Sequence, residues 1–230
     1  NSLTNTITIQ GESGDSSLVR LEHTDYVTNK FIELTNVAGF TFKDMSFQFF
    51  ADQAYYYFNG CDSLRLISCD FLDQWDLTQF SSCNVLLENN NLPGVYIYDI
   101  DDINSFSSYK ILNNAHISYM NFYASNSSSN LKLLNNTGGP IHIFSDGNSG
   151  SVDTVVVSGN TFNDRQRYEQ MDNDMFIVKD NYINVGVNSE SYFIHADSVL
   201  RNTFTSPLSC SYGSPYVANN RLLRNVSNSN

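Results

Sequence analysis

The sequence predicts an all-β protein, a single-stranded right-handed parallel β-helix in which about nine coils stack into one elongated solenoid. Three observations lead to this prediction. One irregular repeat of about 22 residues runs through most of the chain, its segments alternate apolar and polar side chains, and an asparagine returns at the same bend of successive segments. Together they indicate strands that pair with the equivalent strand of the next repeat.

The repeat is a nine-residue template with apolar residues at positions 2, 4 and 9 and usually asparagine at position 7. Successive segments begin 18 to 24 residues apart, which is too irregular for a strict short-repeat solenoid. In chain order they are GFTFKDMSF (39–47), SLRLISCDF (63–71), NVLLENNNL (84–92), SYKILNNAH (108–116), NLKLLNNTG (130–138), TVVVSGNTF (154–162), MFIVKDNYI (175–183), ADSVLRNTF (196–204) and SPYVANNRL (214–222).

The apolar positions of the template predict the core. Alternation at positions 2 and 4 is typical of a strand with one buried face. After a bend the apolar side chain returns at position 9, which predicts an internal column. Its members are Phe47, Phe71, Leu92, Phe162, Ile183, Phe204 and Leu222.

Position 7 is asparagine in the last seven segments. Amides stacked about 4.8 Å apart, one strand spacing, can hydrogen-bond along the stack and to the backbone of the bends. In several coils a second asparagine precedes it, and asparagine tolerates the left-handed backbone of tight bends. The predicted ladder consists of Asn90, Asn114, Asn136, Asn160, Asn181, Asn202 and Asn220.

We therefore expect one β-helix domain over residues 1–230, with a cap or first coil at 1–38, regular coils at 39–222 and a polar tail at 223–230. A helical solenoid is excluded because no long window keeps apolar residues at helical spacing. A β-sandwich is the stronger rival, but it does not explain why the same bend returns every 22 residues or so.

Composition excludes several classes of function. The formal charge of −12 disfavours binding to nucleic acid and to anionic membranes, and no apolar run is long enough to span a membrane. No signal peptide is visible, and the start at Asn1 suggests a fragment of a longer protein. The four cysteines lack zinc-ligand spacing. Cys61 and Cys83, 22 residues apart, could face each other on adjacent coils, more plausibly as buried thiols than as a disulfide.

Three segments of the chain resemble the rungs of the right-handed parallel β-helix superfamily, namely VVVSGNTF (155–162), IVKDNYI (177–183) and SVLRNTF (198–204). This superfamily includes pectate-lyase-like enzymes, polysaccharide lyases and bacteriophage tailspikes. The resemblance covers residues 39–222 and implies three strands per coil, with ligands along the strand called PB1. It also implies a homotrimer, since tailspikes commonly trimerise. The template would supply the other two strands, so PB1 should lie at 54–58, 75–80, 94–102, 119–124, 139–144 and 191–197.

Alternation within these PB1 segments predicts which side chains point outward. If Val95, Ile97, Ile141 and Ile143 point inward, their neighbours form an outer face. Flat aromatic rings beside hydrogen-bonding carboxylates suit a sugar, which has an apolar face and a rim of hydroxyls. The predicted ligand-binding residues are Tyr56, Trp75, Tyr96, Tyr98 and His142, with acids nearby at Asp73, Asp76, Asp99, Asp101 and Asp102. Tyrosine is also favoured in strands for structural reasons alone.

Two acidic groups are candidates for catalysis. Asp76, Asp99 and Asp101 could supply the acid and ionised carboxylate of a glycosidase. The predicted loop DRQRYEQMDND (164–174) combines Asp164, Glu169, Asp172 and Asp174 with Arg165 and Arg167. It could hold calcium and a lyase base, or be a solvated loop whose charges neutralise each other. No polygalacturonase motif and no basic groove is evident, so a lyase acting on anionic glycans is disfavoured.

The leading hypothesis is an extracellular, cell-surface or virion glycan-recognising rod of tailspike, receptor-binding fibre or adhesin type, without a cofactor or a metal. The partner would be a polysaccharide or cell-surface glycan, with no nucleic acid and no membrane insertion. The first alternative is a carbohydrate-active enzyme that uses an Asp pair on the PB1 face. The second is a structural spacer in a larger assembly.

Overall fold

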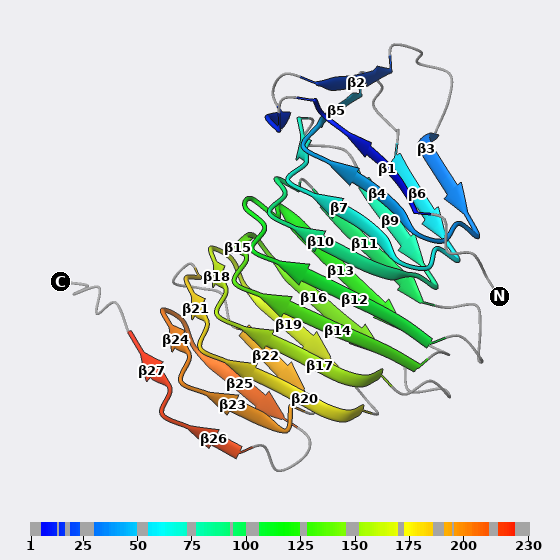
Figure 1. Cartoon of the computed structure of the whole chain (residues 1–230). Coiled ribbons are helices and arrows are strands. Elements are labelled where there is room, and N and C mark those ends of the chain that lie inside the picture. The colour runs from blue at the N-terminus through cyan, green and yellow to red at the C-terminus, as the bar shows by residue number, and fades with distance from the viewer. Residues whose placement is uncertain are drawn as a thin grey trace.

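The protein is a parallel β-helix, which confirms the predicted fold class (Figure 1). The computed structural model describes residues 6–12, 14–16, 19–23, 30–49, 55–72, 77–92, 94–99, 106–124, 128–145, 152–169, 173–185, 191–194, 196–211 and 216–223. Within these ranges every strand pairs in parallel with the equivalent strand of a neighbouring coil. No helix in these ranges is long and apolar enough to cross a membrane.

The coils form three faces. The largest is a ten-stranded sheet of β1 (Ile7–Gln10), β4 (Phe40–Lys43), β7 (Leu64–Ile67), β10 (Asn84–Glu88), β12 (Phe106–Leu112), β14 (Ser128–Leu134), β17 (Val152–Ser158), β20 (Asn173–Lys179), β23 (Ser198–Leu200) and β26 (Tyr216–Ala218). A nine-stranded sheet opposes it, with β3 (Lys30–Thr35), β6 (Tyr55–Asn59), β9 (Leu77–Ser81), β11 (Gly94–Asp99), β13 (Tyr119–Ala124), β16 (Ile141–Ser145), β19 (Gln166–Glu169), β22 (Ser191–Ile194) and β25 (Leu208–Ser211).

The third face is narrow and divided. Its N-terminal part is a three-stranded sheet of β2 (Arg20–His23), β5 (Ser46–Phe49) and β8 (Asp70–Phe71). Its C-terminal part is a five-stranded sheet of β15 (Thr137–Gly138), β18 (Thr161–Phe162), β21 (Tyr182–Ile183), β24 (Thr203–Phe204) and β27 (Arg221–Leu222). Isolated bridges at Asn91, Ala115 and Ile117 connect the two parts.

The template predicted the register of the ten-stranded sheet. Its position 4 forms one continuous file of paired residues, Phe42, Leu66, Leu87, Ile111, Leu133, Val157, Val178, Val199 and Val217. The predicted coil count of nine differs from the structure, because the sheet has a tenth strand, β1, which pairs with β4. Together β1, β2 and β3 supply one strand to each face.

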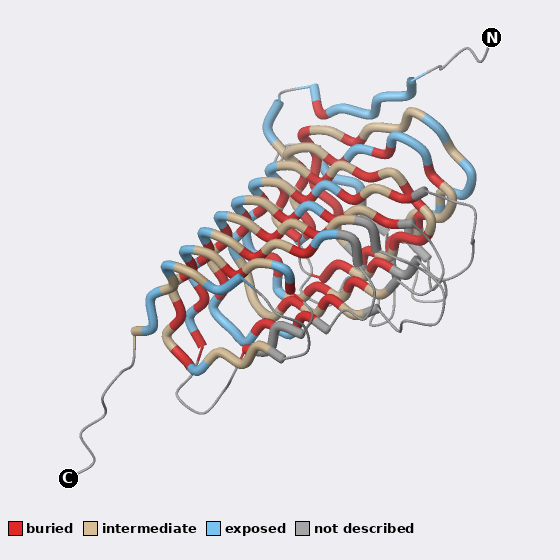
Figure 2. Tube along the Cα trace, turned by 90° about the horizontal axis from the view of Figure 1, so that it is seen from below, coloured by how far each residue is buried: buried red, intermediate tan, exposed pale blue. Residues whose placement is uncertain are grey.

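Buried residues alternate with exposed or half-buried ones along the strands (Figure 2). The buried hydrophobic side chains form one core cluster inside the coils. Six members of the predicted position 9 column are buried, from Phe47 to Phe204, whereas Leu222 is 63% exposed. Leu222 lies in β27, the last described strand of its sheet, so no further described strand covers it. In the fourth segment His116 is exposed and Ile117 is buried, because one additional residue shifts the return to the core.

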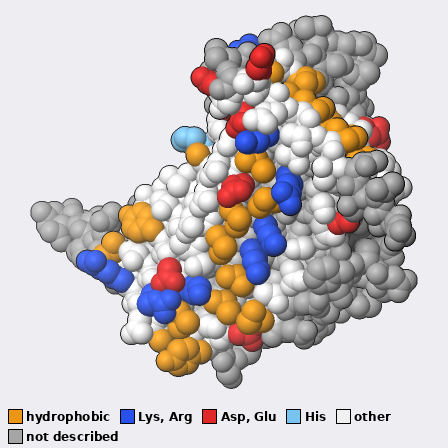
Figure 3. Space-filling view, in the orientation of Figure 1, with side chains coloured by type: hydrophobic (Ala, Val, Ile, Leu, Met, Phe, Trp, Pro, Cys, Tyr) orange, Lys and Arg blue, Asp and Glu red, His pale blue; other side chains and the backbone are white. Residues whose placement is uncertain are grey.

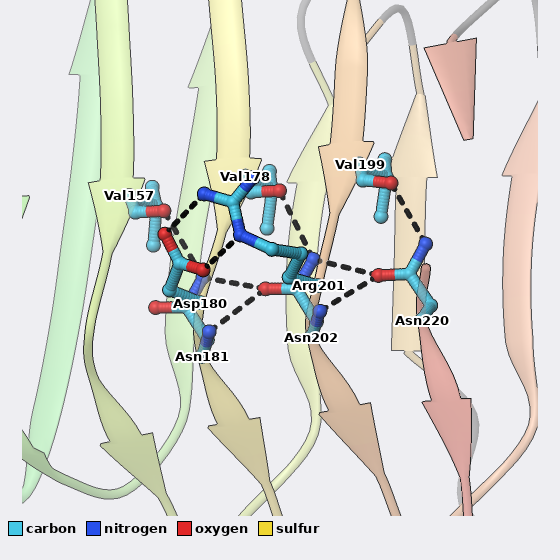
Figure 4. Close-up of polar contacts among 8 residues, drawn as sticks. All are labelled: Val157, Val178, Asp180, Asn181, Val199, Arg201, Asn202 and Asn220. Carbon is cyan, nitrogen blue, oxygen red and sulfur yellow. Dashed lines mark hydrogen bonds and ion pairs between the residues drawn. The ribbon is translucent and has the colours of Figure 1, made fainter. Parts of the chain in front are cut away.

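The predicted asparagine ladder is present and its amides are buried up to Asn202. From Asn114 onward the side-chain oxygen accepts bonds from the backbone N–H and the Nδ2 of the preceding ladder residue, at 2.8–3.1 Å. At the first rung the Asn90 Oδ1 accepts from the backbone N–H of Cys69 at 2.8 Å. In every rung the side-chain Nδ2 also donates to the position 4 carbonyl of the preceding coil, as Asn181, Asn202 and Asn220 do to Val157, Val178 and Val199 (Figure 4). Every described rung therefore satisfies bend backbone that burial would otherwise leave unpaired.

The residue before each ladder position has a positive φ, which explains the paired asparagines. Asn89, Asn113, Asn135 and Asn219 have φ of 56 or 57°, in the left-handed region that asparagine tolerates. In another coil Gly159 takes this position, and the Cβ of any other residue would lie 2.3 Å from the Asn135 Oδ1.

Candidate functional site

The outer surface of the nine-stranded sheet is the face predicted for ligands. The six predicted PB1 segments all contribute a strand to this sheet, namely β6, β9, β11, β13, β16 and β22. Val95, Ile97, Ile141 and Ile143 are at most 1% exposed, so the alternation directs Tyr96 and His142 outward. The predicted outward direction of these two side chains is confirmed.

Register brings outward residues from many coils into one row. Across β3, β6, β9, β11, β13, β16 and β19 the row reads Glu33, Tyr57, Gln79, Tyr96, Asn121, His142 and Arg167. These residues lie 17 to 25 positions apart in the sequence, and neighbouring members are about 4.8 Å apart along the solenoid. The row changes from acidic and amide groups at one end to imidazole and guanidinium at the other.

A shallow hollow of about 380 Å³ lies over β13, β16 and β19. Its outward side chains are Asn121, Tyr123, His142, Phe144 and Arg167, and its floor includes Phe122 and Ile143. The rings of Tyr123 and Phe144 stack, with centroids 5.3 Å apart and planes 15° apart. Both rings are half-buried, so their outer parts form an apolar surface beside the polar row.

A second group of rings borders the hollow. Tyr119 lies between Tyr96 and His142, with ring centroids 5.5 and 5.6 Å away. The Tyr119 hydroxyl is 3.5 Å from the His142 Nδ1. The imidazole therefore has a neighbouring ring and a neighbouring hydroxyl that restrict its orientation. We name the set of Tyr96, Tyr119, Asn121, Tyr123, His142, Phe144 and Arg167 the aromatic patch.

Sequence reasoning placed two members of the aromatic patch, Tyr96 and His142, on this face, named Arg167 in a different candidate site, and missed the other four. Tyr119, Asn121 and Tyr123 follow from the segment YMNFYA once Met120 and Phe122 are assigned to the core, where both are fully buried. Phe144 follows in the same way from His142, two residues earlier. Arg167 was assigned to the predicted loop 164–174 and not to this face, because its segment was interpreted as a loop and not as strand β19.

The prediction that Tyr56 points outward is wrong. Tyr56 is 1% exposed and packs edge-on against Phe47 and Phe71, at 5.7 and 5.0 Å between centroids. In the segment AYYYF the buried residue Phe58 sets the phase of the strand, so Tyr56, two positions earlier, shares its inward side. Tyr57 takes the outward position.

The side chains of the remaining predicted site residues lie outside the described part of the structure. Trp75, Asp76 and Asp101 lie outside the described residues, as do Asp73 and Asp102. Tyr98 and Asp99 belong to β11, but their side chains are outside the description. The prediction that Asp76, Asp99 and Asp101 form a catalytic group therefore stays a prediction.

The acidic and basic segment 164–174 is in part a strand. Gln166–Glu169 forms β19, so the prediction of one continuous loop is wrong for these residues. Tyr168 is fully buried, and this burial raises the pKa of its hydroxyl, which donates to the Gln166 Oε1 at 3.1 Å. Asp164 and Arg165 are exposed, and Asp172 lies outside the description. Among the described residues no group of three His, Cys, Asp or Glu could hold a metal ion.

Cys61 and Cys83 face each other on adjacent coils as free thiols. The backbone N–H of Cys61 donates to the Cys83 Sγ at 3.3 Å, and both residues are 1% exposed. Side-chain hydrogen bonding with Cys83 lowers the pKa of the Cys61 thiol to about 7, while the same bond and burial raise that of Cys83. Both cysteines belong to the hydrophobic core cluster, where they pack as small apolar residues.

Comparison with known proteins adds no relative to this picture. No family model matches the chain, and neither curated proteins nor solved structures give a match. The relationship to pectate-lyase-like enzymes and tailspikes therefore stays a prediction, and the structure itself establishes the parallel β-helix fold.

Proposed function

We propose that this protein is an extracellular, non-enzymatic rod that recognises a glycan through the aromatic patch. The observation that carries the proposal is the hollow of about 380 Å³, in which a stacked pair of rings adjoins an amide, an imidazole and a guanidinium. Sugar sites in proteins combine a flat apolar surface with a few placed polar groups, because each sugar has an apolar CH face and a polar rim.

The geometry supports a specific orientation of the sugar. A sugar that contacts the exposed parts of Tyr123 and Phe144 would have its hydroxyls directed toward Asn121, two residues before Tyr123 on β13, and toward Arg167 on β19, which pairs with β16. Asn121 offers both donors and an acceptor, and Arg167 offers donors alone. Because the strands stack in parallel, successive sugars of a chain would follow the solenoid axis toward Tyr119 and Tyr96.

The wider assignment rests on the fold and the resemblance of the rungs. A rigid solenoid that presents a ligand row on one face suits a tailspike, a receptor-binding fibre or a surface adhesin. Location on a virion or cell surface, and assembly into a homotrimer, belong to this proposal. The composition agrees with it, since only 16% of the residues are charged and hydroxyl and amide side chains are abundant.

Binding of the protein to an array of capsular and cell-wall glycans tests the proposal. We expect retention of at least one neutral or weakly charged glycan, and about tenfold weaker binding by Tyr123→Ala, which corresponds to about 1.4 kcal/mol. Tyr182→Ala is the matched control, because Tyr182 is 40% exposed in β21, outside the patch. Equal losses in the two variants, or no binding to any glycan, would contradict the proposal, and a silent array would favour a structural spacer.

The same glycans separate a binder from an enzyme. A binder leaves their reducing ends unchanged during long incubation. Release of reducing ends by the parent protein, abolished in the double variant Asp99→Asn and Asp101→Asn, would replace the proposal with a glycosidase.

A further inference from the structure

The outer face of the ten-stranded sheet is basic, although the chain carries 24 acidic and 12 basic residues. The outward positions 3 and 5 of the template hold Lys43, Arg65, Lys110, Lys132 and Lys179 in this sheet. At the same positions of the described strands Glu88 is the one acidic residue. Figure 3 shows the basic side chains beside a band of apolar ones on this face.

Three of these cations form a row along the solenoid. Arg65, Lys110 and Lys132 occupy position 3 on β7, β12 and β14, with Leu86 of β10 between the first two. Arg65 and Lys110 are therefore about 10 Å apart at the backbone, and Lys132 is about 5 Å further. All three are exposed.

These three cations form no ion pair with a carboxylate in the described part of the chain. No carboxylate there lies within ion-pair distance of them, whereas Lys43 is 3.6 Å from Asp44, and Arg201 binds Asp180 at 2.7 and 2.8 Å. Charges more than about 8 to 10 Å away are largely screened at physiological salt. Beside the three cations of the row, the nearby described carboxylates are Asp62, which lines the same hollow, and Glu88 on β10, so cations outnumber carboxylates here.

A polar shelf accompanies the row. A hollow of about 310 Å³ is lined by Arg65 and Lys110 together with Ser63, Asn84 and Ser108. Asp62 also lines it, but this carboxylate accepts a bond from the Asn84 Nδ2 at 3.0 Å and one from the Ser63 hydroxyl at 3.5 Å. The hydroxyl and amide groups at position 1 continue along the sheet with Asn130 and Thr154.

We propose that the outer face of the ten-stranded sheet, from β7 to β14, binds a linear anionic polysaccharide. Its carboxylate or sulfate groups would pair with Arg65, Lys110 and Lys132, and its hydroxyls would bond to Ser63, Asn84 and Ser108. A row of cations without ion-pair partners in the described part of the chain suits a polymer with regularly spaced anions, and the hydroxyl and amide shelf suits sugar hydroxyls better than an acidic peptide. The site lies on the opposite face from the aromatic patch and does not depend on it.

Affinity electrophoresis in gels containing dextran sulfate or polygalacturonate, with neutral dextran and poly-L-glutamate as comparisons, tests this proposal. Three ionic contacts at a slope of about 0.7 each predict about a twentyfold loss of affinity between about 50 and 200 mM salt. The triple variant Arg65→Gln, Lys110→Gln and Lys132→Gln should bind at least tenfold more weakly. The matched control Arg20→Gln, Arg165→Gln and Arg221→Gln removes the same charge from exposed residues elsewhere and should bind within twofold of the parent.

The remaining outcomes of these binding experiments decide for or against the proposal. No retention by either anionic polysaccharide, or equal weakening by the two triple variants, would overturn the proposal. Retention by poly-L-glutamate at equal strength would overturn it in favour of an acidic protein partner. Tyr123→Ala should retain full binding to the anionic polymers, which separates this site from the aromatic patch. Thermal melting within about 2 °C of the parent confirms that the exposed substitutions leave the fold intact.

Discussion

Replacing a central rung of the ladder, Asn136→Ala, tests how strongly the asparagine stack stabilises the solenoid. The Asn136 Oδ1 accepts from the backbone N–H and the Nδ2 of Asn114, at 2.9 and 3.0 Å. Its Nδ2 donates to the Ile111 carbonyl at 2.8 Å and to the Asn160 Oδ1 at 3.0 Å. Alanine removes these bonds and retains the one from the backbone N–H of residue 136 to Asn160.

The cost follows from the groups that alanine leaves unpaired. The backbone N–H of Asn114 loses its acceptor and the Ile111 carbonyl loses a donor, in a bend where Asn114 and Asn136 are at most 1% exposed, whereas the Asn114 Nδ2 keeps its bonds to the Leu87 and Leu112 carbonyls. An unsatisfied buried polar group costs about 1 to 3 kcal/mol, so a total of about 4 kcal/mol is expected. For a chain of this size that lowers the melting temperature by about 8 to 16 °C.

Thermal melting followed by circular dichroism measures this loss. Asn163→Ala is the control, because Asn163 is exposed, and its change should stay within about 0.5 kcal/mol. If Asn136→Ala melted together with Asn163→Ala, the amide stack would contribute nothing measurable and the reasoning would be refuted.

Two further predictions concern titratable groups. A thiol reagent at about pH 8 should label half-buried Cys210 first in the native protein and should reach Cys61, Cys69 and Cys83 only after denaturation. Although the pKa of the Cys61 thiol is about 7, burial keeps the reagent away from its sulfur. Rapid labelling of two or more thiols in the native protein would contradict this prediction. The Arg201 guanidinium lowers the pKa of Asp180, so this carboxylate stabilises the fold above its unfolded pKa and loses that effect as pH falls through its folded pKa. Melting of Asp180→Asn should therefore approach that of the parent in acid below about pH 4, and a constant difference across pH would argue against the pair.

The sequence predicted the fold well because the residue types that recur in the repeat each favour one local structure. Asparagine at position 7 and a tolerant residue before it define a bend, and apolar positions 2 and 4 define the strand that enters it. The alignment on this bend placed Leu87, Ile111 and Leu133 in the register that the structure shows. It failed where a coil gains a residue, as at His116 and Ile117, and at Leu222 on the last described strand.

The site was harder to predict because it depends on the phase of short strands. A shift of one residue exchanges the inward and outward sides. In AYYYF (54–58) the three tyrosines are chemically equivalent, and only Phe58 indicates that Tyr56 is on the buried side of the strand. In VYIY (95–98) and IHI (141–143) the branched aliphatic residues alternate with polar or aromatic ones, so they show which side of the strand is buried. The basic row was missed for another reason: Arg65, Lys110 and Lys132 are far apart in the sequence and meet at template position 3 only when the coils are stacked.

Nuclear magnetic resonance of protein with labelled tyrosine and histidine, titrated with a glycan that the array identifies, tests the glycan-binding claim most directly. The account predicts that signals of Tyr119, Tyr123 and His142 shift with one common affinity, while those of Tyr182 and Tyr216, exposed elsewhere on the coils, stay in place. Shifts confined to Tyr182 and Tyr216, or a glycan that binds without moving the three patch signals, would contradict it.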